Sequence, residues 1–553
     1  MQSKDEIRVA LLCRGTAFDA WEAESVKQVM SLPYVKIVLL VNEKPEATSK
    51  PSFFKKIVDY PWSILSWRLL NRFRLKIPAN QKVDLTNELK GIPSIEVLPE
   101  RKGKFSEYFS EHDLRKVKEH APDLILRFAF NILRGEILTV AKYGVWSFHH
   151  ADEQIIRGGP AAFWEIYFNL PKTGAILQRL TEKLDGGIIL RKGYFRTIRR
   201  SYKANLDQLL MGTTSWMKQA VIDVHNGISP AENGTPVATN AVLYKFPRNR
   251  QMFRFRWIQR KEKWKFHFAE LFKAEKWTVA ILDQSPTELL EGGIVRKPDW
   301  LTEMPRGKYI ADPFGWRDAD GKLQVVAEEY DYKKRKGVIS AVRGDEKKNL
   351  LPEKHHLSYP FVLRSGKEIK ILPEAFQSGE LSAYDLAGNK KVILKNFAAV
   401  DATPIEYKGK WWLFCTEGGD LSNTALHIFH ADSFDGEWKP HENNPVKWDI
   451  SSARPAGTLF VANGKLYRPS QDCSTTYGAA VVLNEITDLS EKNFSEKQVS
   501  RIETGQSWKF NKGLHTVSIV DDKTILIDAK RYEFNLPNFS YKLGQKLRKL
   551  FGS

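Results

Sequence analysis

The stretch Tyr143–Leu190 decides the fold of the first part of the chain and reads YGVWSFHHADEQIIRGGPAAFWEIYFNLPKTGAILQRLTEKLDGGIIL. A short apolar strand ends in two histidines, His149 and His150, and a glycine-bounded loop with one arginine follows. The stretch closes on Leu-Asp-Gly-Gly, which contains Asp185. A histidine at the carboxyl end of a strand, with an aspartate from a later turn, is how an open α/β sheet builds a proton-transfer site.

Shorter apolar runs lie upstream of this stretch and predict the sheet that it joins. Ile7–Cys13, Lys36–Val41 and Leu124–Phe128 are separated by polar or helix-forming segments. That alternation is typical of βαβ units around a mostly parallel sheet. Arg14 and Gly15 follow the first run, where a strand turns into a helix, and we expect them to bind an anionic group of a substrate.

The order and spacing of these residues resemble the N-terminal domain of folate-dependent formyltransferases, which act on methionyl-tRNA, glycinamide ribonucleotide or sugar amines. In that family a strand carries Asn-x-His, an Arg-Gly pair follows a short loop, and Leu-Asp-x-Gly ends the motif. The resemblance runs from about Ile7 to Asn240. It implies a Rossmann-like α/β domain over residues 1–240, with 10-formyltetrahydrofolate as the formyl donor.

The resemblance also implies a role for each matching residue. His149 falls on the catalytic histidine and Asp185 on the catalytic aspartate. Arg157 and Gly158 fall on the Arg-Gly pair, which implies binding of substrate or cofactor. Ser147 replaces the family's asparagine, whose amide would donate to the oxyanion. Because losing such a donor costs about 3–4 kcal/mol of transition-state stabilisation, we expect this change to affect the rate more than the fold.

Two other interpretations of this segment stand beside a working formyltransferase site. The first is that the formyltransferase fold is kept around a site that has lost its activity. A metal site is the second, because His149, His150, Asp152 and Glu153 are all metal-ligand residue types. Adjacent residues on a strand point to opposite faces, so the four side chains cannot all converge, and we expect no metal.

The chain is too long for a single core, since 553 residues predict two or three domains. Its 42% hydrophobic and 27% charged residues are typical of a soluble globular protein. No apolar run reaches the ~18–20 residues of a membrane span, and the start MQSKDEIR lacks the apolar core of a signal peptide. Three widely spaced cysteines, Cys13, Cys415 and Cys473, argue against a disulfide framework. We expect a cytoplasmic protein.

The formal net charge of +19 predicts attraction to polyanions. Basic and aromatic residues alternate in Ser52–Ile77 and Lys245–Trp277, and Asn538–Ser553 reads NFSYKLGQKLRKLFGS. We assign residues 241–275 as a basic aromatic linker and residues 536–553 as a basic amphipathic tail. These segments predict peripheral contact with an anionic membrane at its inner face and no specific binding of nucleic acid. The alternative is that the aromatic side chains pack against neighbouring domains.

After Trp277 the sequence changes to short strand-like pieces at intervals of about 50 residues. Four of them follow a turn with a polar residue beside a proline, and a fifth turn lacks the proline. A repeat of this period built from short strands predicts a β-propeller, here of five blades over residues 276–535. The turns are Ala311–Phe314, Ser358–Phe361, Asp401–Pro404, Ala453–Ala456 and Leu514–Val517.

This half resembles the five-bladed, glycosyl-hydrolase-43-like propeller domain of plant glucosamine inositolphosphorylceramide transferases. The matching pieces include ADPF, SYPFV, DATP and GKLYRPSQDC. A funnel lined by their turn residues can bind sugar hydroxyls, hydrolyse a glycoside with paired carboxylates, or serve only the structure. The expected funnel residues are Asp312, Glu374, Asp401, Arg454, Arg468, Gln471, Asp472 and His515.

Together these features predict transfer of a formyl group from 10-formyltetrahydrofolate to the amine of an amino sugar. The acceptor would be nucleotide-linked, lipid-linked or part of a surface glycan, and the propeller would bind the glycan. One alternative is a glycan-binding or glycan-processing protein with a degenerate formyltransferase domain. The other is formylation of methionyl-tRNA, which takes support from the charge but lacks a recognisable tRNA-binding domain.

Overall fold

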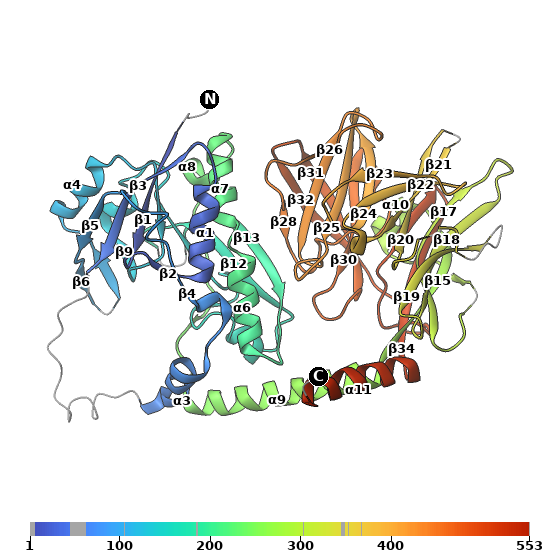
Figure 1. The fold of residues 1–553 in the computed structure, drawn as a ribbon, viewed down its shortest axis with the longest axis horizontal. Helices are drawn as coiled ribbons and strands as arrows, with labels where there is room; N and C mark the ends of the chain where they lie inside the picture. The colour runs from blue at the N-terminus through green and yellow to red at the C-terminus, as the bar shows by residue number, and fades with distance from the viewer. Residues whose placement is uncertain are drawn as a thin grey trace. The chain divides into compact units, whose positions relative to one another are not determined.

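The computed structural model describes residues 6–44, 62–103, 105–183, 186–301, 303–343, 349–351, 353–366 and 368–551 (Figure 1). The chain divides into two compact units, Met1–Lys263 and Trp264–Ser553. Within the described ranges, no helix combines the length and the apolar character that crossing a membrane requires. Part of the basic segment Ser52–Ile77, up to residue 61, lies outside the described residues.

Unit 1 is built on one seven-stranded sheet, in the order β13-β12-β10-β8-β1-β3-β5. The strands from β5 to β10 run parallel, whereas β12 and β13 are antiparallel to their neighbours. The expected α/β domain is therefore confirmed. The bounds are β1 Ile7–Cys13, β3 Val35–Glu43, β5 Ser94–Val97, β8 Leu124–Arg127, β10 Val145–His149, β12 Lys172–Arg179 and β13 Ile188–Arg196.

The central strands are apolar because they are covered on both faces. In β1, six of the seven residues are buried, as expected for the middle of a parallel sheet. Helix α1 begins at a capping box, in which Asp19 and Glu22 satisfy the first backbone N–H groups. The remaining main elements of unit 1 are β2 Ala17–Asp19, α1 Ala20–Met30, α3 Leu65–Leu69, β4 Lys82–Asp84, β6 Glu100–Lys102, β7 Ser106–Tyr108, α4 Glu111–Glu119, β9 Ile132–Arg134, β11 Arg157–Gly158, α5 Trp164–Tyr167, α6 Tyr202–Gly212, α7 Trp216–His225, α8 Pro230–Asn233 and β14 Leu243–Tyr244.

The segment expected to be a linker, residues 241–275, is largely one helix. Helix α9 spans Asn249–Phe272, and the division between the two units falls within it. The C-terminal tail is also helical, as α11 at Leu536–Phe551. Both helices keep the alternation of basic and aromatic residues that marks these segments in the sequence.

Unit 2 consists of five antiparallel sheets that follow one another along the chain. The fifth sheet joins the first strands of the unit to its last ones, because β15 pairs with β34 along ten residues of each. The sheets are β17 Lys308–Arg317, β18 Leu323–Asp331 and β19 Lys336–Arg343; β20 Ser358–Ser365, β21 Glu368–Glu374, β22 Leu381–Asp385 and β23 Lys390–Leu394; β24 Ala399–Tyr407, β25 Lys410–Glu417, β26 Ala425–Ala431, β27 Lys439–Pro440 and β28 Lys447–Trp448; β29 Phe460–Ala462, β30 Lys465–Asp472, β31 Ala480–Leu489 and β32 Phe494–Ile502; and β16 Asp299–Trp300, β15 Ala274–Asp283, β34 Thr524–Glu533 and β33 Val517–Asp521. A short helix, α10 at Pro286–Gly292, lies between β15 and β16.

The first strands of three successive sheets share one backbone irregularity. Each pairs with its neighbour through a bulge, and each bulge holds a non-glycine residue with positive φ: Asp312 (52°), Tyr359 (42°) and Asp401 (51°). The left-handed conformation costs about 1–2 kcal/mol for such residues. The bulges, rather than the prolines, therefore align the repeat, and Ala402 takes the place of Pro313 and Pro360.

Neighbouring sheets of unit 2 pack against one another. Strand β17 contacts both β20 and β33, which links the first sheet to the second and to the fifth. A cluster that includes Phe414 and Leu466 joins the third sheet to the fourth, and a bridge between Gly457 and Val517 joins the fourth to the fifth. Strand β24 contacts β20 and β21, which links the second sheet to the third. A ring of five blades requires contacts of this kind, and the propeller itself stays a prediction.

The contact between the fourth and fifth sheets can be tested at Gly457. An alanine Cβ there would lie 1.9 Å from the carbonyl oxygen of Val517, and φ is 116°. We expect Gly457→Ala to lower the unfolding free energy by roughly 3 kcal/mol or more, measured by denaturant unfolding of the full chain. The matched control is Gly464→Ala, which has φ 73° but nothing within 4 Å, and which carries only the backbone cost. Equal losses in the two variants would contradict the contact.

Candidate functional site

A cavity of about 160 Å³ lies at the carboxyl ends of β8 and β10 in unit 1. These two strands are parallel neighbours, so their last residues meet at one edge of the sheet. The antiparallel strand β12 closes one side with Gln178. The polar lining residues are Arg127, Asn131, Arg134, Ser147, His149, Gln178, Thr181 and Lys183, and the apolar ones include Leu133 and Leu180.

Arg127 places a cation beside the residue that stands at the family's asparagine position. Its Nη1 donates to Ser147 Oγ at 2.7 Å, and its Nη2 donates to the carbonyl oxygens of Phe130 and Asn131 at 2.8 and 2.7 Å. Its Nε is buried and has no hydrogen-bond partner. Burial lowers the pKa of this guanidinium, while Glu107 and Glu43 raise it. No sequence motif singled out Arg127, although an arginine directly after the apolar run Leu-Ile-Leu was the available signal.

The two adjacent histidines lie in different surroundings, as strand geometry requires. His149 lines the cavity, with Nε2 3.4 Å from the carbonyl oxygen of Ile156. His150 stacks on Phe148 at 5.4 Å and meets the edge of Trp21 at 5.2 Å. Burial, assisted by the nearby His149, lowers the pKa of His150 to about 3. His149 is therefore the histidine that faces the cavity, and His150 belongs to the packing.

Asp152 and Glu153 do not join either histidine in a metal site. Lys192 Nζ lies 2.8 Å from an Asp152 oxygen and 2.9 Å from a Glu153 oxygen, and Tyr194 donates to Asp152 at 3.0 Å. Burial raises the pKa of Asp152, but the hydrogen bond from Lys192 and the other bonds lower it further, so that the pKa lies below its ordinary value. The lysine thus offsets part of the negative charge of these two carboxylates.

Four other expected residues of unit 1, Arg14, Gly15, Arg157 and Gly158, lie outside this cavity lining. Arg14 pairs with Glu43 at 2.7 Å, and the backbone N–H of Gly15 donates to Asn42 at 2.7 Å. Arg157 and Gly158 form β11, which pairs with β14. Asp185 falls outside the described residues, so its expected pairing with His149 stays a prediction.

A second cavity, of about 250 Å³, lies in unit 2 and collects four of the eight expected funnel residues: Asp312, Glu374, Arg454 and His515. Trp277 from β15 and Tyr309 from β17 supply part of its wall. Aromatic side chains beside carboxylates and an arginine form the kind of surface that binds a sugar, with C–H faces on the rings and hydroxyls on the charged groups.

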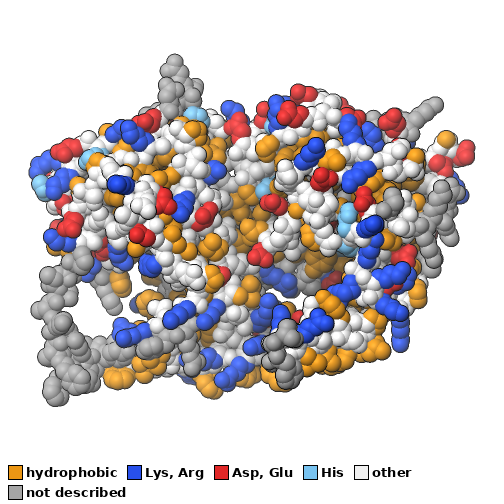
Figure 2. Space-filling view, viewed as in Figure 1, with side chains coloured by type: hydrophobic (Ala, Val, Ile, Leu, Met, Phe, Trp, Pro, Cys, Tyr) orange, Lys and Arg blue, Asp and Glu red, His pale blue; other side chains and the backbone are white. Residues whose placement is uncertain are grey.

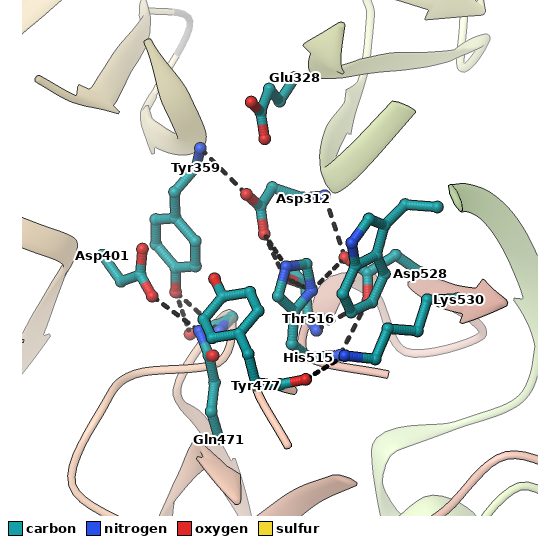
Figure 3. Close-up of polar contacts among 12 residues, drawn as sticks. Asp312, Glu328, Tyr359, Asp401, Gln471, Tyr477, His515, Thr516, Asp528 and Lys530 are labelled. Atoms are coloured by element: carbon teal, nitrogen blue, oxygen red, sulfur yellow. Dashed lines mark hydrogen bonds and ion pairs between the residues drawn. The ribbon is translucent and has the colours of Figure 1, made fainter. Parts of the chain in front are cut away.

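Asp312 and His515, which line this cavity, form one hydrogen-bonded group with Asp528, which is not a lining residue (Figure 3). His515 Nδ1 lies 2.6 Å from Asp528, its Nε2 lies 3.6 Å from Asp312, and Thr516 donates to Asp312 at 2.6 Å. Burial lowers the pKa of His515, but both carboxylates outweigh it and hold that pKa above its ordinary value. Burial likewise raises the pKa of Asp312. Their ligand atoms lie within 4.8 Å of one another, yet protein partners already occupy them.

Arg454 holds the second group of the cavity together. It donates to Asp401 at 2.6 Å and lies 3.4 Å from Glu374, while Gln471 donates to Asp401 at 2.7 Å. The guanidinium also lies over the ring of Tyr477 at 5.2 Å. Burial and the Asp401 charge raise the pKa of Glu374 well above its ordinary value. Asp401 and Gln471 thus support the arginine from behind the cavity surface.

The structure does not bring Arg468 or Asp472 into this cavity. Arg468 pairs with Glu496 at 2.6 Å and donates to the carbonyl oxygen of Ser452, inside the fourth sheet. Asp472 pairs with Arg501. Both lie on β30 with Gln471, and residues of opposite parity on a strand point to opposite faces.

Glu328 is the main cavity residue that the sequence analysis missed. It lies on β18, buried, and its Oε1 has no hydrogen-bond partner. Burial and the surrounding carboxylates raise its pKa well above the ordinary value, which favours the protonated carboxyl, the form that can donate a hydrogen bond. Figure 3 draws it with no contact to the other labelled residues. A glutamate within the apolar strand LQVVAEEY was the available signal.

Comparison with known proteins gives a different relative for each unit. The family model described as "Glucosamine inositolphosphorylceramide transferase 1, N-terminal" matches residues 305–518. The protein of that name from Oryza sativa subsp. japonica is 34% identical over 209 residues, which is 35% of this chain and 28% of the relative. Methionyl-tRNA formyltransferase from Bacillus cytotoxicus is 33% identical over 124 residues, which is 22% of this chain and 36% of the relative. The chain thus spans about a third or less of the curated relatives that it matches.

Solved structures give weaker likenesses. Phosphoribosylglycinamide formyltransferase from Anaplasma phagocytophilum is 16% identical, with a TM-score of 0.29, and covers 43% of this chain and 100% of its own. The sugar 3N-formyl transferase WlaRD is 11% identical, with a TM-score of 0.26, over 44% of this chain and 70% of its own. At these TM-scores the likeness carries no functional inference.

The low pKa of the buried His150 makes the stability of the fold depend on pH. The pKa of His150 is about 3 in the folded chain, against about 6.5 in an unfolded one, so the unfolded state takes up the proton first as pH falls. The stability that a neutral His150 contributes is therefore present above pH ~6.5 and lost below it. We expect hydrogen exchange of β10, corrected for intrinsic rates, to speed up between pH 7 and pH 5 in the wild type and less so in His150→Phe. The control His112→Phe alters an exposed histidine, and a wild-type slope in His150→Phe would contradict the assignment.

Proposed function

We propose that unit 1 transfers a formyl group from 10-formyltetrahydrofolate to the amine of an amino sugar, and that unit 2 binds the glycan that carries this sugar. The observation that carries the proposal is the unit 1 cavity, where His149, Ser147 and Arg127 meet at the ends of two parallel strands. The match to methionyl-tRNA formyltransferase over 124 residues supports the reaction class. The relatives of unit 2 are named for glucosamine, an amino sugar, and for a ceramide lipid, which supports the acceptor class.

The cavity residues fit the formyl donor chemically. A folate ring has apolar faces and a hydrogen-bonding edge. Leu133 and Leu180 offer apolar contacts, while the amides of Asn131 and Gln178 can bind the edge. When bound, 10-formyltetrahydrofolate supplies the electrophilic formyl carbon.

Two side chains, His149 and Arg127, have separate tasks in the proposed reaction. The imidazole of His149 takes the proton that the attacking amine must lose. With a proton on Nε2 the ring donates to the Ile156 carbonyl, which leaves Nδ1 as the basic atom. Arg127 keeps its positive charge at the cavity edge through three hydrogen bonds, and a fixed charge there stabilises a developing oxyanion. It thereby compensates for Ser147, which replaces an amide donor with a hydroxyl.

In unit 2 we infer that the five sheets are the blades of a propeller around the second cavity. The pairing of β15 with β34 and the contacts between successive sheets support this arrangement. The neutral carboxyl of Glu328 would donate to a sugar oxygen, and the Asp312 carboxylate would accept from a hydroxyl. Arg454 would bind an anionic group of the same glycan.

A product assay tests the function directly. Purified full-length protein would be incubated with 10-formyltetrahydrofolate and three kinds of acceptor: nucleotide-linked amino sugars, glucosamine-containing glycolipids, and initiator methionyl-tRNA. We expect mass spectrometry to find one added formyl group on at least one amino-sugar acceptor. Formylation of the tRNA alone would favour that alternative, and the absence of any product would favour a degenerate site.

The roles in unit 1 predict distinct kinetic losses. His149→Ala removes the base and should lower kcat by about 10²–10⁴-fold. Arg127→Gln removes the cation and should lower kcat by about 10²–10³-fold, whereas the control Arg115→Gln, on exposed α4, should not. Ser147→Asn restores the amide and should keep or raise the rate. Near-normal turnover in His149→Ala, with the fold intact by circular dichroism, would rule out the proposed base.

The roles in unit 2 predict an effect on KM that depends on the acceptor. Glu328→Met removes the proposed donor, and Asp312→Asn replaces a charged acceptor with a weaker neutral one, so each should raise KM about tenfold or more for a glycan-linked acceptor. Neither should change the kinetics with a minimal amino-sugar nucleotide, and the control Asp420→Asn, at an exposed site, should change nothing. Equal damage with both acceptors would contradict the division of work between the units.

A further inference from the structure

Helix α11 presents an apolar stripe that no other part of unit 2 covers in the described chain. Leu536, Leu543 and Leu547 are 62%, 37% and 45% exposed. Positions i, i+7 and i+11 of an α-helix lie on one face, so the three side chains form a line along the axis.

Contacts on both flanks fix the orientation of α11. On one flank the ring of Phe539 lies 5.4 Å from that of Phe272, and Lys546 Nζ pairs with Glu270 at 2.9 Å. On the other flank Arg335 lies over the ring of Tyr541 at 3.3 Å. The helix is therefore packed by its sides, and its leucine stripe is directed away from those contacts.

The end of α9 within unit 2 continues this surface with aromatic side chains. Trp264, Phe268 and Phe272 recur every four residues, on one side of the helix, and are 79%, 56% and 40% exposed. Phe272 stacks with Phe268 at 4.8 Å and with Phe534 at 6.4 Å, and Phe534 is itself 54% exposed. We call these four aromatic residues, together with the three leucines of α11, the helix-pair surface. A soluble monomer rarely leaves so many large apolar side chains together in water.

Basic residues accompany the helix-pair surface. Helix α11 contains Lys542, Lys546, Arg548 and Lys549 and no acidic residue. Lys265 adds a further basic residue on the adjoining turn of α9. Figure 2 shows Lys and Arg side chains next to hydrophobic ones along the edge where Figure 1 draws α11 beside the end of α9.

We propose that the helix-pair surface binds an anionic lipid bilayer, with its aromatic and leucine side chains in the interface and its basic residues on the headgroups. Aromatic rings and leucines on one face with Lys and Arg beside them are the composition of a helix that lies in a membrane interface. Single-stranded nucleic acid would use only the aromatic part of the surface for stacking, whereas a membrane interface uses the leucine stripe as well. A second copy of the chain would bring the same four bases of α11 against themselves, which repel one another.

Vesicle co-sedimentation with the full-length protein tests the proposal. We expect binding to phosphatidylcholine vesicles that contain phosphatidylserine, little binding to phosphatidylcholine alone, and weaker binding as salt rises. Leu543→Ser/Leu547→Ser and Trp264→Ser/Phe268→Ser should each lower the partition coefficient by about tenfold or more. The matched control, Leu386→Ser/Val461→Ser, alters side chains that are 59% and 56% exposed elsewhere in unit 2 and should leave binding unchanged.

Several outcomes would overturn the proposal. Absence of vesicle binding by the wild type would do so, as would equal losses in the control and in the helix variants. Light scattering that finds a dimer in the wild type and a monomer in the leucine variant, with no vesicle binding, would assign the surface to self-association. Binding of single-stranded RNA that the same substitutions abolish, without lipid binding, would assign it to nucleic acid. Circular dichroism and thermal unfolding establish that each variant is folded.

Discussion

Unit 2 depends on the antiparallel pairing of β15 with β34, which joins its first long strand to its last. The pairing also positions part of the cavity wall. Trp277 on β15 lines the cavity and lies opposite Lys530 on β34 in the register. Lys530 pairs with Glu275 at 2.7 Å, and Asp528 on the same strand holds His515. A single ladder of backbone hydrogen bonds thus fixes the fold and one wall of the site.

The two cavities handle buried charge in different ways. In unit 1 the Arg127 guanidinium of the cavity donates to Ser147 and to two backbone carbonyl oxygens. In unit 2 the carboxylates outnumber their cations, so burial and mutual repulsion favour protons on Glu328 and Glu374. A cavity with neutral acids beside charged ones can both donate to and accept from a ligand rich in hydroxyl groups.

The sequence predicts those parts of the structure that belong to a repeat or to a recognisable motif. The α/β sheet followed from apolar runs at β1, β8 and β10, and the position of His149 followed from its place at the end of β10. Arg127 and Glu328 were missed because each lies on a strand without a motif, where only packing reveals what the side chain faces. Arg468 and Asp472 were grouped with Gln471 although strand alternation separates them, an argument that the sequence already allowed.

The ladder between β15 and β34 has a consequence for biosynthesis. A ribosome releases β15 early and β34 only some 240 residues later, so for most of translation β15 has no antiparallel partner on that edge. An unpaired apolar strand is a place where nascent chains associate wrongly. Unit 1 precedes it and can fold first, because domains generally fold as units in the order of their synthesis. Completion of unit 2 is therefore a late event, and a chain cut short before Thr524 would leave the unit open along β15.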